Sequence, residues 1–224
     1  MNTRTGKPVE PEHPTVFIVD DDEDLRRALQ RLIRSAGWRA EGFSNAQAFL
    51  ERLPYNGAGC ILLDIEMPGM SGPELQKALL EKRISLPVIY LTGHANVPNS
   101  IDAMKTGALD FLLKPADETS VLSTAAAAIA GHVAALAHAS EQSEIASRLS
   151  RLSTRERQVM EAVIVGRLNK QIAADLGITE KTVKAHRARV MEKLEIRSVA
   201  VLVRLCIAGN VASVPRAAAR RSPD

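Results

Sequence analysis

The hydrophobic positions of the first half of the chain form short continuous runs, each followed by polar or turn residues. Such runs predict strands at residues 15–19, 61–63, 87–91 and 108–113, and the first, which has no polar alternation, is expected to be covered on both faces. Residues 39–43 predict a further, weaker strand. Between them, apolar residues recur at helical spacing and predict helices at residues 25–36, 45–53, 72–82, 98–106 and 119–130. Five strands alternating with five helices predict an α/β fold with a doubly wound, five-stranded parallel sheet.

The second half of the chain shows helical spacing only. Ser153 and Glu156 form the capping box of a helix that ends at Gly166, and a short helix begins at Asn169. After a glycine turn at 177, a longer helix runs to about residue 194, which predicts a helix-turn-helix. A last helix, 198–208, is predicted to present Val199, Leu202, Val203 and Leu205. We therefore expect a first domain at 15–131, a helical, poorly packed linker at 132–150, and a smaller all-α domain at 151–213.

Charge divides the chain in the same way. Residues 15–131 contain 11 Lys and Arg against 15 Asp and Glu, whereas residues 151–224 contain 15 against 7. A basic domain suggests a polyanionic partner, most often nucleic acid. Cys60 and Cys206 lie in apolar runs and are expected to be buried free thiols of a reducing cytoplasm. No apolar run approaches 18 residues, so no membrane span is expected.

Polar side chains stand at the ends of four predicted strands: Asp20 and Asp21, Asp64, Thr92, and Lys114. In doubly wound sheets these ends meet at one rim, where the site lies. Clustered carboxylates suit Mg²⁺, and an aspartate such as Asp64 can form an acyl phosphate. Lys114 supplies a compact positive charge and Thr92 a hydroxyl donor for phosphoryl oxygens. No Walker loop is present, so the phosphoryl donor should be another molecule.

The second helix of the predicted helix-turn-helix has one apolar and one basic face. Lys181, Lys184, Ala185 and Ala188 lie roughly opposite its apolar residues, and Thr182 and Arg189 flank them. The small alanines allow the backbone to approach the floor of a groove, and the lysines can reach guanine edges or phosphates. Arg187 falls nearer the buried edge, from which its long side chain can still extend to a phosphate.

The acidic half resembles the receiver domain of two-component response regulators over about residues 15–131. The resemblance rests on Asp20-Asp21, Asp64 followed by Met67-Pro68-Gly69, Thr92, and Lys114-Pro115. It implies that a histidine kinase phosphorylates Asp64, and that Thr92 and Phe111 are switch residues. It also implies Mg²⁺ ligation by Asp21, Asp64 and the Glu66 backbone carbonyl, with Asp20 acting mostly through water. Two departures are Ala116, where Phe is commoner, and the additional acid Asp22.

The basic half is similar to the LuxR-type DNA-binding domain over about residues 148–213, in the motifs at 153–159, 169–173 and 181–186. Together the two halves resemble the NarL/FixJ family, and Thr92-Gly93-His94 with Val97-Pro98 resembles its FixJ branch. The resemblance implies a cytoplasmic transcription regulator, not a conventional enzyme, that forms a homodimer on phosphorylation through residues 98–106 and 109–113. RNA polymerase is a candidate partner and a membrane is not. Promoter DNA is expected to contact Asn169, Lys170, Lys181, Thr182, Lys184, Ala185, Arg187, Ala188 and Arg189.

Three alternatives remain open at this stage. A phosphatase of the haloacid-dehalogenase kind also uses an aspartyl nucleophile, but Asp64-Ile65-Glu66 offers only Asp-x-Glu and no second domain supplies a cap. A receiver-like domain that dimerises without phosphate is disfavoured by the intact set of site residues. RNA binding is disfavoured because residues 151–224 contain no Phe, Tyr or Trp on which bases could stack.

Overall fold

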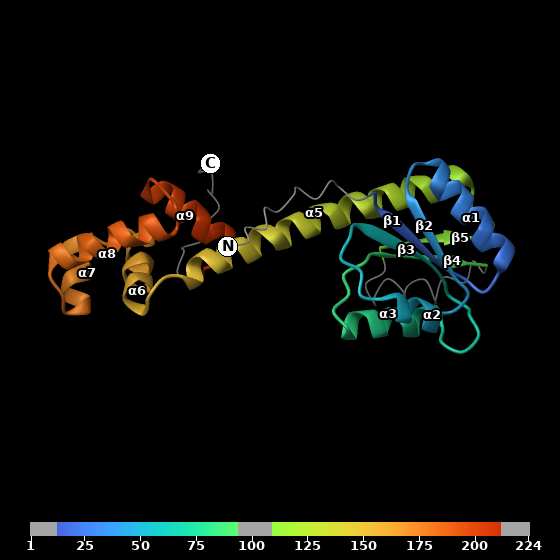
Figure 1. Ribbon diagram of the computed structural model, residues 1–224, viewed down its shortest axis with the longest axis horizontal. Coiled ribbons are helices and arrows are strands. Elements are labelled where there is room, and N and C mark those ends of the chain that lie inside the picture. The colour runs from blue at the N-terminus through green and yellow to red at the C-terminus, as the bar shows by residue number, and fades with distance from the viewer. Residues whose placement is uncertain (1–12, 94–108, 212–224) are drawn as a thin grey trace, which may run out of the picture. The chain divides into compact units, whose positions relative to one another are not determined.

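A computed structural model describes residues 13–93 and 109–211 of the chain (Figure 1). The chain divides into two compact units, residues 1–136 and 137–224. The first unit is a sheet with helices on both faces, and the second consists of helices only. This confirms the predicted fold class, and each unit is described by itself below.

The sheet of the first unit contains five parallel strands in the order β2-β1-β3-β4-β5. This order reverses the winding direction between β1 and β3, as in other doubly wound sheets. The predicted strands are all present, with ends within two residues of the expected ones. Their bounds are Thr15–Val19 (β1), Arg39–Phe43 (β2), Gly59–Asp64 (β3), Val88–Thr92 (β4) and Asp110–Leu113 (β5).

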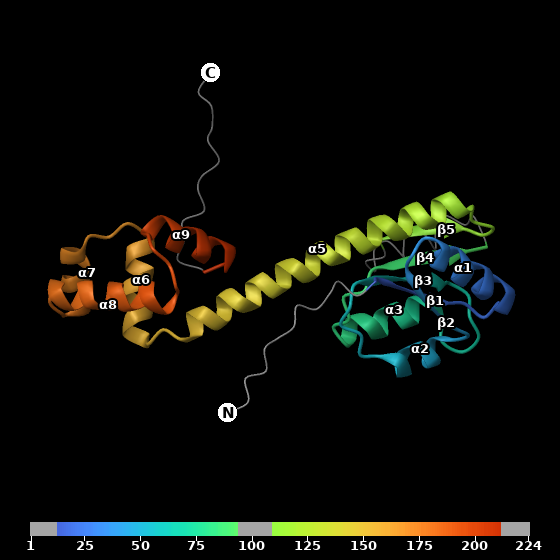
Figure 2. The ribbon, with the colours of Figure 1, turned by 45° about the horizontal axis from the view of Figure 1, so that its top comes forward.

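Two helical layers cover this sheet (Figure 2). Alternate strand residues face opposite layers, as the pleat of a strand requires. Phe17 and Ile61 pack with α2 (Ala46–Arg52) and α3 (Gly72–Glu81). Ile18 and Leu62 pack with α1 (Glu23–Ser35) and the first part of α5 (Glu118–Ser150). The helix predicted at 98–106 lies outside the described residues.

The helix α5 is one element of 33 residues, where the sequence predicts a helix followed by a linker. Val121, Ala125 and Ile129 are buried on the sheet. The expectation of poor packing is wrong for the end of the helix, because Ile145 and Leu149 are buried in the core of the second unit. By length and composition α5 is apolar enough to cross a membrane, contrary to expectation. Of the most apolar 18-residue stretch of this helix, 28% is buried.

A histidine ties α5 to the start of β3. His132 is 5% exposed, and its Nδ1 lies 3.1 Å from the backbone nitrogen of Gly59. Burial lowers the pKa of His132, which favours the neutral ring. Nδ1 also lies 3.1 Å from the Gly59 carbonyl oxygen, so the tautomer decides whether it accepts from the Gly59 nitrogen or donates to this oxygen. Gly59 itself lies so close to β1 that an added Cβ would be 2.1 Å from the Thr15 carbonyl oxygen.

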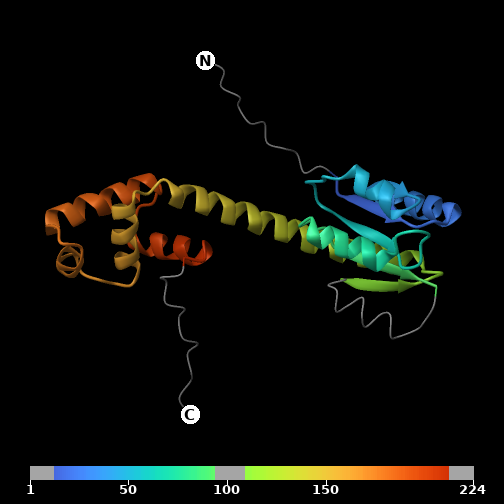
Figure 3. The same cartoon turned by 90° about the horizontal axis from the view of Figure 1, so that it is seen from below.

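The second unit packs the end of α5 against α6 (Thr154–Ile164), α7 (Asn169–Leu176), α8 (Glu180–Lys193) and α9 (Val199–Ala208). Ser153 and Glu156 form the predicted capping box. Gly177 makes the predicted turn with a positive φ of 65°, and Figures 1 and 3 show the helices on either side of it crossing. The predicted face of α9 is corrected: Leu202 is buried and its three companions are partly buried, while Val201 and Ile207 are exposed.

Both cysteines are free and buried, as predicted. Cys60 lies within β3, where burial raises the pKa of its thiol to about 12. Cys206 lies on the inner side of α9. Neither thiol is therefore a reactive thiolate at neutral pH.

Candidate functional site

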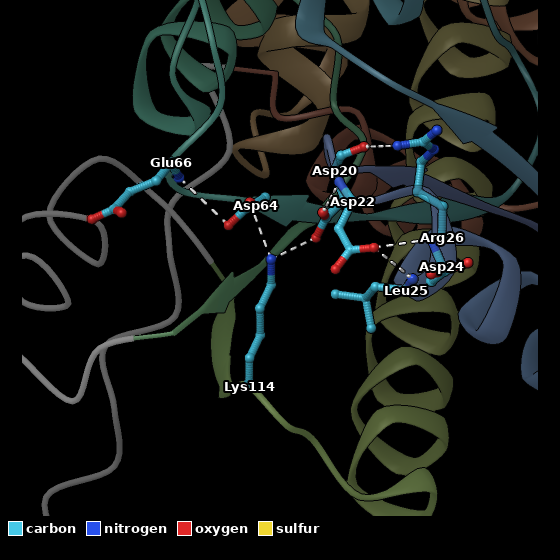
Figure 4. Close-up of polar contacts among 8 residues, drawn as sticks. All are labelled: Asp20, Asp22, Asp24, Leu25, Arg26, Asp64, Glu66 and Lys114. Carbon is cyan, nitrogen blue, oxygen red and sulfur yellow. Dashed lines mark hydrogen bonds and ion pairs between the residues drawn. The ribbon is translucent and has the colours of Figure 1, made fainter.

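The carboxyl ends of four strands bring Asp20, Asp64, Thr92 and Lys114 to one rim of the sheet. Their alignment follows from the strand register, in which Val19 pairs with Leu63, Asp64 with Leu91, and Thr92 with Leu113. Each polar residue is thus the last residue of a strand or directly follows one. Figure 4 shows the side chains of Asp20, Asp64 and Lys114 pointing toward one another.

Three carboxylates at this rim form a candidate metal centre. One oxygen from each of Asp20, Asp21 and Asp64 lies within 4.8 Å of the others. Asp20 is fully buried, Asp64 is 7% exposed and Asp21 is exposed, so the cluster is open on one side only. Carboxylate oxygens in this number suit a hard divalent cation that retains several waters, which is the habit of Mg²⁺. The donor set therefore fits the predicted cation.

Lys114 makes ion pairs with two of these carboxylates. Its Nζ lies 2.6 Å from Asp20 Oδ2 and 3.0 Å from Asp64 Oδ2. Burial alone would lower the pKa of Lys114, but the hydrogen bonds to Asp20 and Asp64 outweigh it and raise the pKa. Lys114 is therefore a permanent cation at the rim.

The environment of Asp64 raises the pKa of its carboxyl. Burial raises the pKa of this carboxyl, and the neighbouring Asp20 adds to the rise, while Lys114 opposes it. A divalent cation at the cluster would favour the carboxylate and hence the nucleophile. The Glu66 side chain is exposed and points away from Asp64 in Figure 4, although its backbone nitrogen lies 3.4 Å from Asp64 Oδ1. Only main-chain atoms of Glu66 face the cluster.

The loop after β1 is held by two residues whose roles the sequence analysis missed. Asp22, taken there as an additional acid of the cluster, is the N-cap of α1 and accepts from the backbone nitrogens of Asp24 and Leu25. Arg26 Nη1 donates to the Asp20 carbonyl oxygen at 2.7 Å (Figure 4). A short acid immediately before a helical pattern is the sequence signal for such a cap.

The two predicted switch residues lie on neighbouring strands. Thr92 is 8% exposed at the end of β4, and its carbonyl oxygen accepts from the Lys114 backbone nitrogen at 2.7 Å. Phe111 is 38% exposed on β5, between Leu109 and Leu113, which are 51% and 48% exposed. The edge strand thus presents an apolar surface to solvent.

The second unit places most of the predicted DNA contacts on one exposed face of α8. Val183 and Val190 are buried, Thr182 is partly buried, and the other contacts predicted opposite them are exposed: Lys181, Lys184, Ala185, Ala188 and Arg189. Lys170, near the start of α7, is exposed as well. Asn169 and Arg187 are partly buried and hydrogen-bonded to each other, with Arg187 Nη1 donating to Asn169 Oδ1 at 2.7 Å.

Comparison with known proteins agrees with both sites. Residues 16–126 match the response regulator receiver domain, and residues 150–206 match the bacterial regulatory proteins of the luxR family. The chain is 42% identical to the transcriptional regulatory protein FixJ of Rhizobium meliloti (strain 1021), over 88% of this chain and 96% of that protein. The chain belongs to the FixJ-like response regulators.

Other relatives and solved structures support the same assignment. The response regulator protein TodT of Pseudomonas putida (strain F1) is 40% identical to this chain. The match covers 85% of this chain and 84% of TodT. The structure of the response regulator StyR superimposes with a TM-score of 0.80 at 42% identity, over 87% of this chain and 98% of that one. The receiver and LuxR-type resemblances are thereby confirmed, and the family is one of transcription regulators.

Proposed function

We propose that Asp64 accepts a phosphoryl group from a cognate sensor histidine kinase. A carboxylate oxygen of Asp64 attacks phosphorus, the phosphorus–nitrogen bond of the kinase phosphohistidine breaks, and the imidazole nitrogen leaves with the electron pair. The observation that carries this proposal is the cluster of three carboxylates, whose oxygens lie within 4.8 Å of one another. Lys114 makes ion pairs with two of them, Asp20 and Asp64. Such a set serves no purpose in packing, because it gathers like charges at one rim.

Mg²⁺ is the proposed cofactor. Asp21, Asp64 and the Glu66 carbonyl oxygen would hold it, and Asp20 would contact it mostly through water. The cation would offset the repulsion between the acids and the incoming phosphoryl oxygens. Lys114 and the Thr92 hydroxyl then donate to phosphoryl oxygens, which replaces one of the present contacts of Lys114 with the carboxylates.

Phosphorylation is proposed to pair two receivers. It adds about 1.5 to 2 negative charges at Asp64. Thr92 moves toward these oxygens and Phe111 turns inward, which reshapes the surface made by Leu109, Phe111 and Leu113 on β5. The rest of the proposed surface, 98–106, lies outside the described residues.

The paired receivers are proposed to act on promoter DNA. Dimers present two copies of α8 to half-sites roughly one helical turn apart. The basic exposed face of α8, together with Lys170, contacts bases and phosphates. RNA polymerase is a further proposed partner. The proposed location is the cytoplasm, where a histidine kinase domain, DNA and RNA polymerase are all present.

The test compares two isosteric variants, Asp64→Asn and Asp24→Asn. Asp24 is an exposed acid in the first turn of α1, and its carboxylate is outside the cluster. Intact-mass measurement after incubation with acetyl phosphate and Mg²⁺ should show one added phosphoryl group on the wild type and on Asp24→Asn, and none on Asp64→Asn. Equal labelling of both variants would contradict the assignment. If neither the wild type nor either variant were labelled, a receiver that works without phosphate would be favoured.

A further inference from the structure

The hydrogen bond between Arg187 and Asn169 joins the two helices of the helix-turn-helix. Asn169 is the first residue of α7, and Arg187 lies in the second half of α8, eighteen residues later. Arg187 is partly buried, and its side chain lines a cavity of about 40 Å³ together with Val159, Met160 and Met191. Its guanidinium therefore does not lie free on the exposed face of α8, where Lys184 and Arg189 are found.

The chemistry of the pair fixes which way the Asn169 amide faces. A guanidinium has five N–H donors and no acceptor, so only the amide oxygen can face it. The Oδ1 atom of Asn169 is accordingly the acceptor, at 2.7 Å from Arg187 Nη1. This leaves the Nδ2 group, with two N–H donors, on the other side of a partly exposed side chain next to the exposed Lys170.

We propose that Arg187 is a positioning residue that orients the Asn169 amide so that its N–H donors meet a DNA phosphate. With the amide reversed, its oxygen would face the phosphate oxygens and repel them. Arg187 thus acts on DNA through Asn169 and does not pair with a phosphate itself. The inference rests on the proposed DNA binding and deepens it, because the sequence predicts the two residues as independent contacts.

Salt dependence separates the two roles of Arg187. Each phosphate paired with a charged side chain contributes about 0.9 to the slope of log affinity against log salt concentration, whereas a neutral amide contributes nothing of this kind. Arg187→Met keeps the apolar stem against the cavity and removes the guanidinium. We expect it to lower affinity by roughly three- to ten-fold with the slope unchanged. Arg189→Met, on the exposed face, should reduce the slope by about 0.9.

Two further variants connect the effect to Asn169. Asn169→Asp keeps an acceptor for Arg187, so folding is preserved, but it places a carboxylate where the amide donors were; affinity should fall by roughly ten-fold or more. Asn169→Ala should lower affinity, and adding Arg187→Met to it should cause no further loss, because the pair acts as a unit.

The measurement uses the full chain with acetyl phosphate and Mg²⁺, a fluorescein-labelled mixed-sequence duplex, and fluorescence anisotropy at several salt concentrations. Far-UV circular dichroism establishes that each variant is folded at the temperature used. Additive losses from Arg187→Met and Asn169→Ala, a slope reduced by Arg187→Met, or full affinity of Asn169→Asp would each overturn the inference alone. A wild type that does not bind the duplex would overturn the proposed DNA binding and this inference with it.

Discussion

Lys114 offsets part of the negative charge of the acidic rim, because its ammonium group lies between Asp20 and Asp64. The same contacts mean that Lys114 and Mg²⁺ compete for the charge of Asp20 and Asp64. Replacing Lys114 with Met should therefore tighten Mg²⁺ binding by roughly three- to ten-fold, while slowing phosphorylation. Isothermal titration calorimetry measures the first effect. An unchanged or weaker Mg²⁺ affinity would show that the lysine does not offset these carboxylates.

A second charged pair supports the DNA-binding unit. Glu156 is 3% exposed, and its Oε2 accepts from Lys193 Nζ at 2.7 Å and from the Ser153 backbone nitrogen at 2.8 Å. The hydrogen bond from Lys193, followed by that from Ser153, lowers the pKa of Glu156 from its ordinary 4.5 to about 2. The stabilisation is complete above pH 4.5 and is lost as the pH falls toward about 2.

Glu156→Gln should destabilise this unit by about 1 to 2 kcal/mol at neutral pH and remove part of its loss of stability in acid. Thermal melts followed by circular dichroism between pH 2 and 7 test this. Tryptophan fluorescence would not report on this unit, since the only tryptophan, Trp38, lies in the receiver. Glu192→Gln, at an exposed neighbour of Lys193, serves as the control and should behave as wild type. Identical acid profiles for both variants would refute the role of the pair.

The sequence indicated the residues of the site better than their contacts. Asp64, Thr92 and Lys114 could be placed because each ends or directly follows a predicted strand, and strand ends of a parallel sheet meet. Two contacts could not be predicted: the hydrogen bond of Arg26 to the Asp20 carbonyl and that of Arg187 to Asn169. Each depends on how a long side chain lies between two elements. No local pattern specifies such a pairing.

Among the helices, two glycines with opposite conformational roles give a matched test. Gly177 has a φ of 65°, whereas Gly131 lies within α5, and a Cβ at either would meet nothing within 4 Å. Gly177→Ala should cost about 1 to 2 kcal/mol through the left-handed backbone alone. Gly131→Ala should stabilise α5 by roughly 0.5 to 1 kcal/mol. Urea unfolding measures both, and equal effects would show that backbone conformation does not decide them.

Element types were easier to predict than element lengths. Strand ends were marked by turn residues, and the start of α6 by Ser153, which caps that helix in the structure. The continuity of α5 was missed because Gly131 resembles a helix end and the residues after it are small and polar. Ile145 and Leu149, spaced four apart, were the signal that its last turns pack into the second core.

At the scale of the whole molecule, the exposed apolar residues of β5 offer a test of receiver pairing. Leu113→Glu places a charge within the proposed pairing surface, which should abolish dimerisation on phosphorylation while leaving labelling of Asp64 intact. Leu80→Glu is the control, since Leu80 is 57% exposed on α3, outside the proposed pairing surface. Size-exclusion chromatography with light scattering distinguishes them. A dimer of Leu113→Glu would place the pairing surface elsewhere.

The central claim is that negative charge added at Asp64 is read out on DNA. The most direct measurement is a combined sizing and gel-shift comparison of the wild type and Asp64→Asn, each with and without acetyl phosphate plus Mg²⁺, on a duplex selected by the phosphorylated wild type. We predict that the phosphodonor converts only the wild type to a dimer and raises only its affinity, by roughly ten-fold or more. Equal dimerisation and DNA binding by Asp64→Asn would contradict the account.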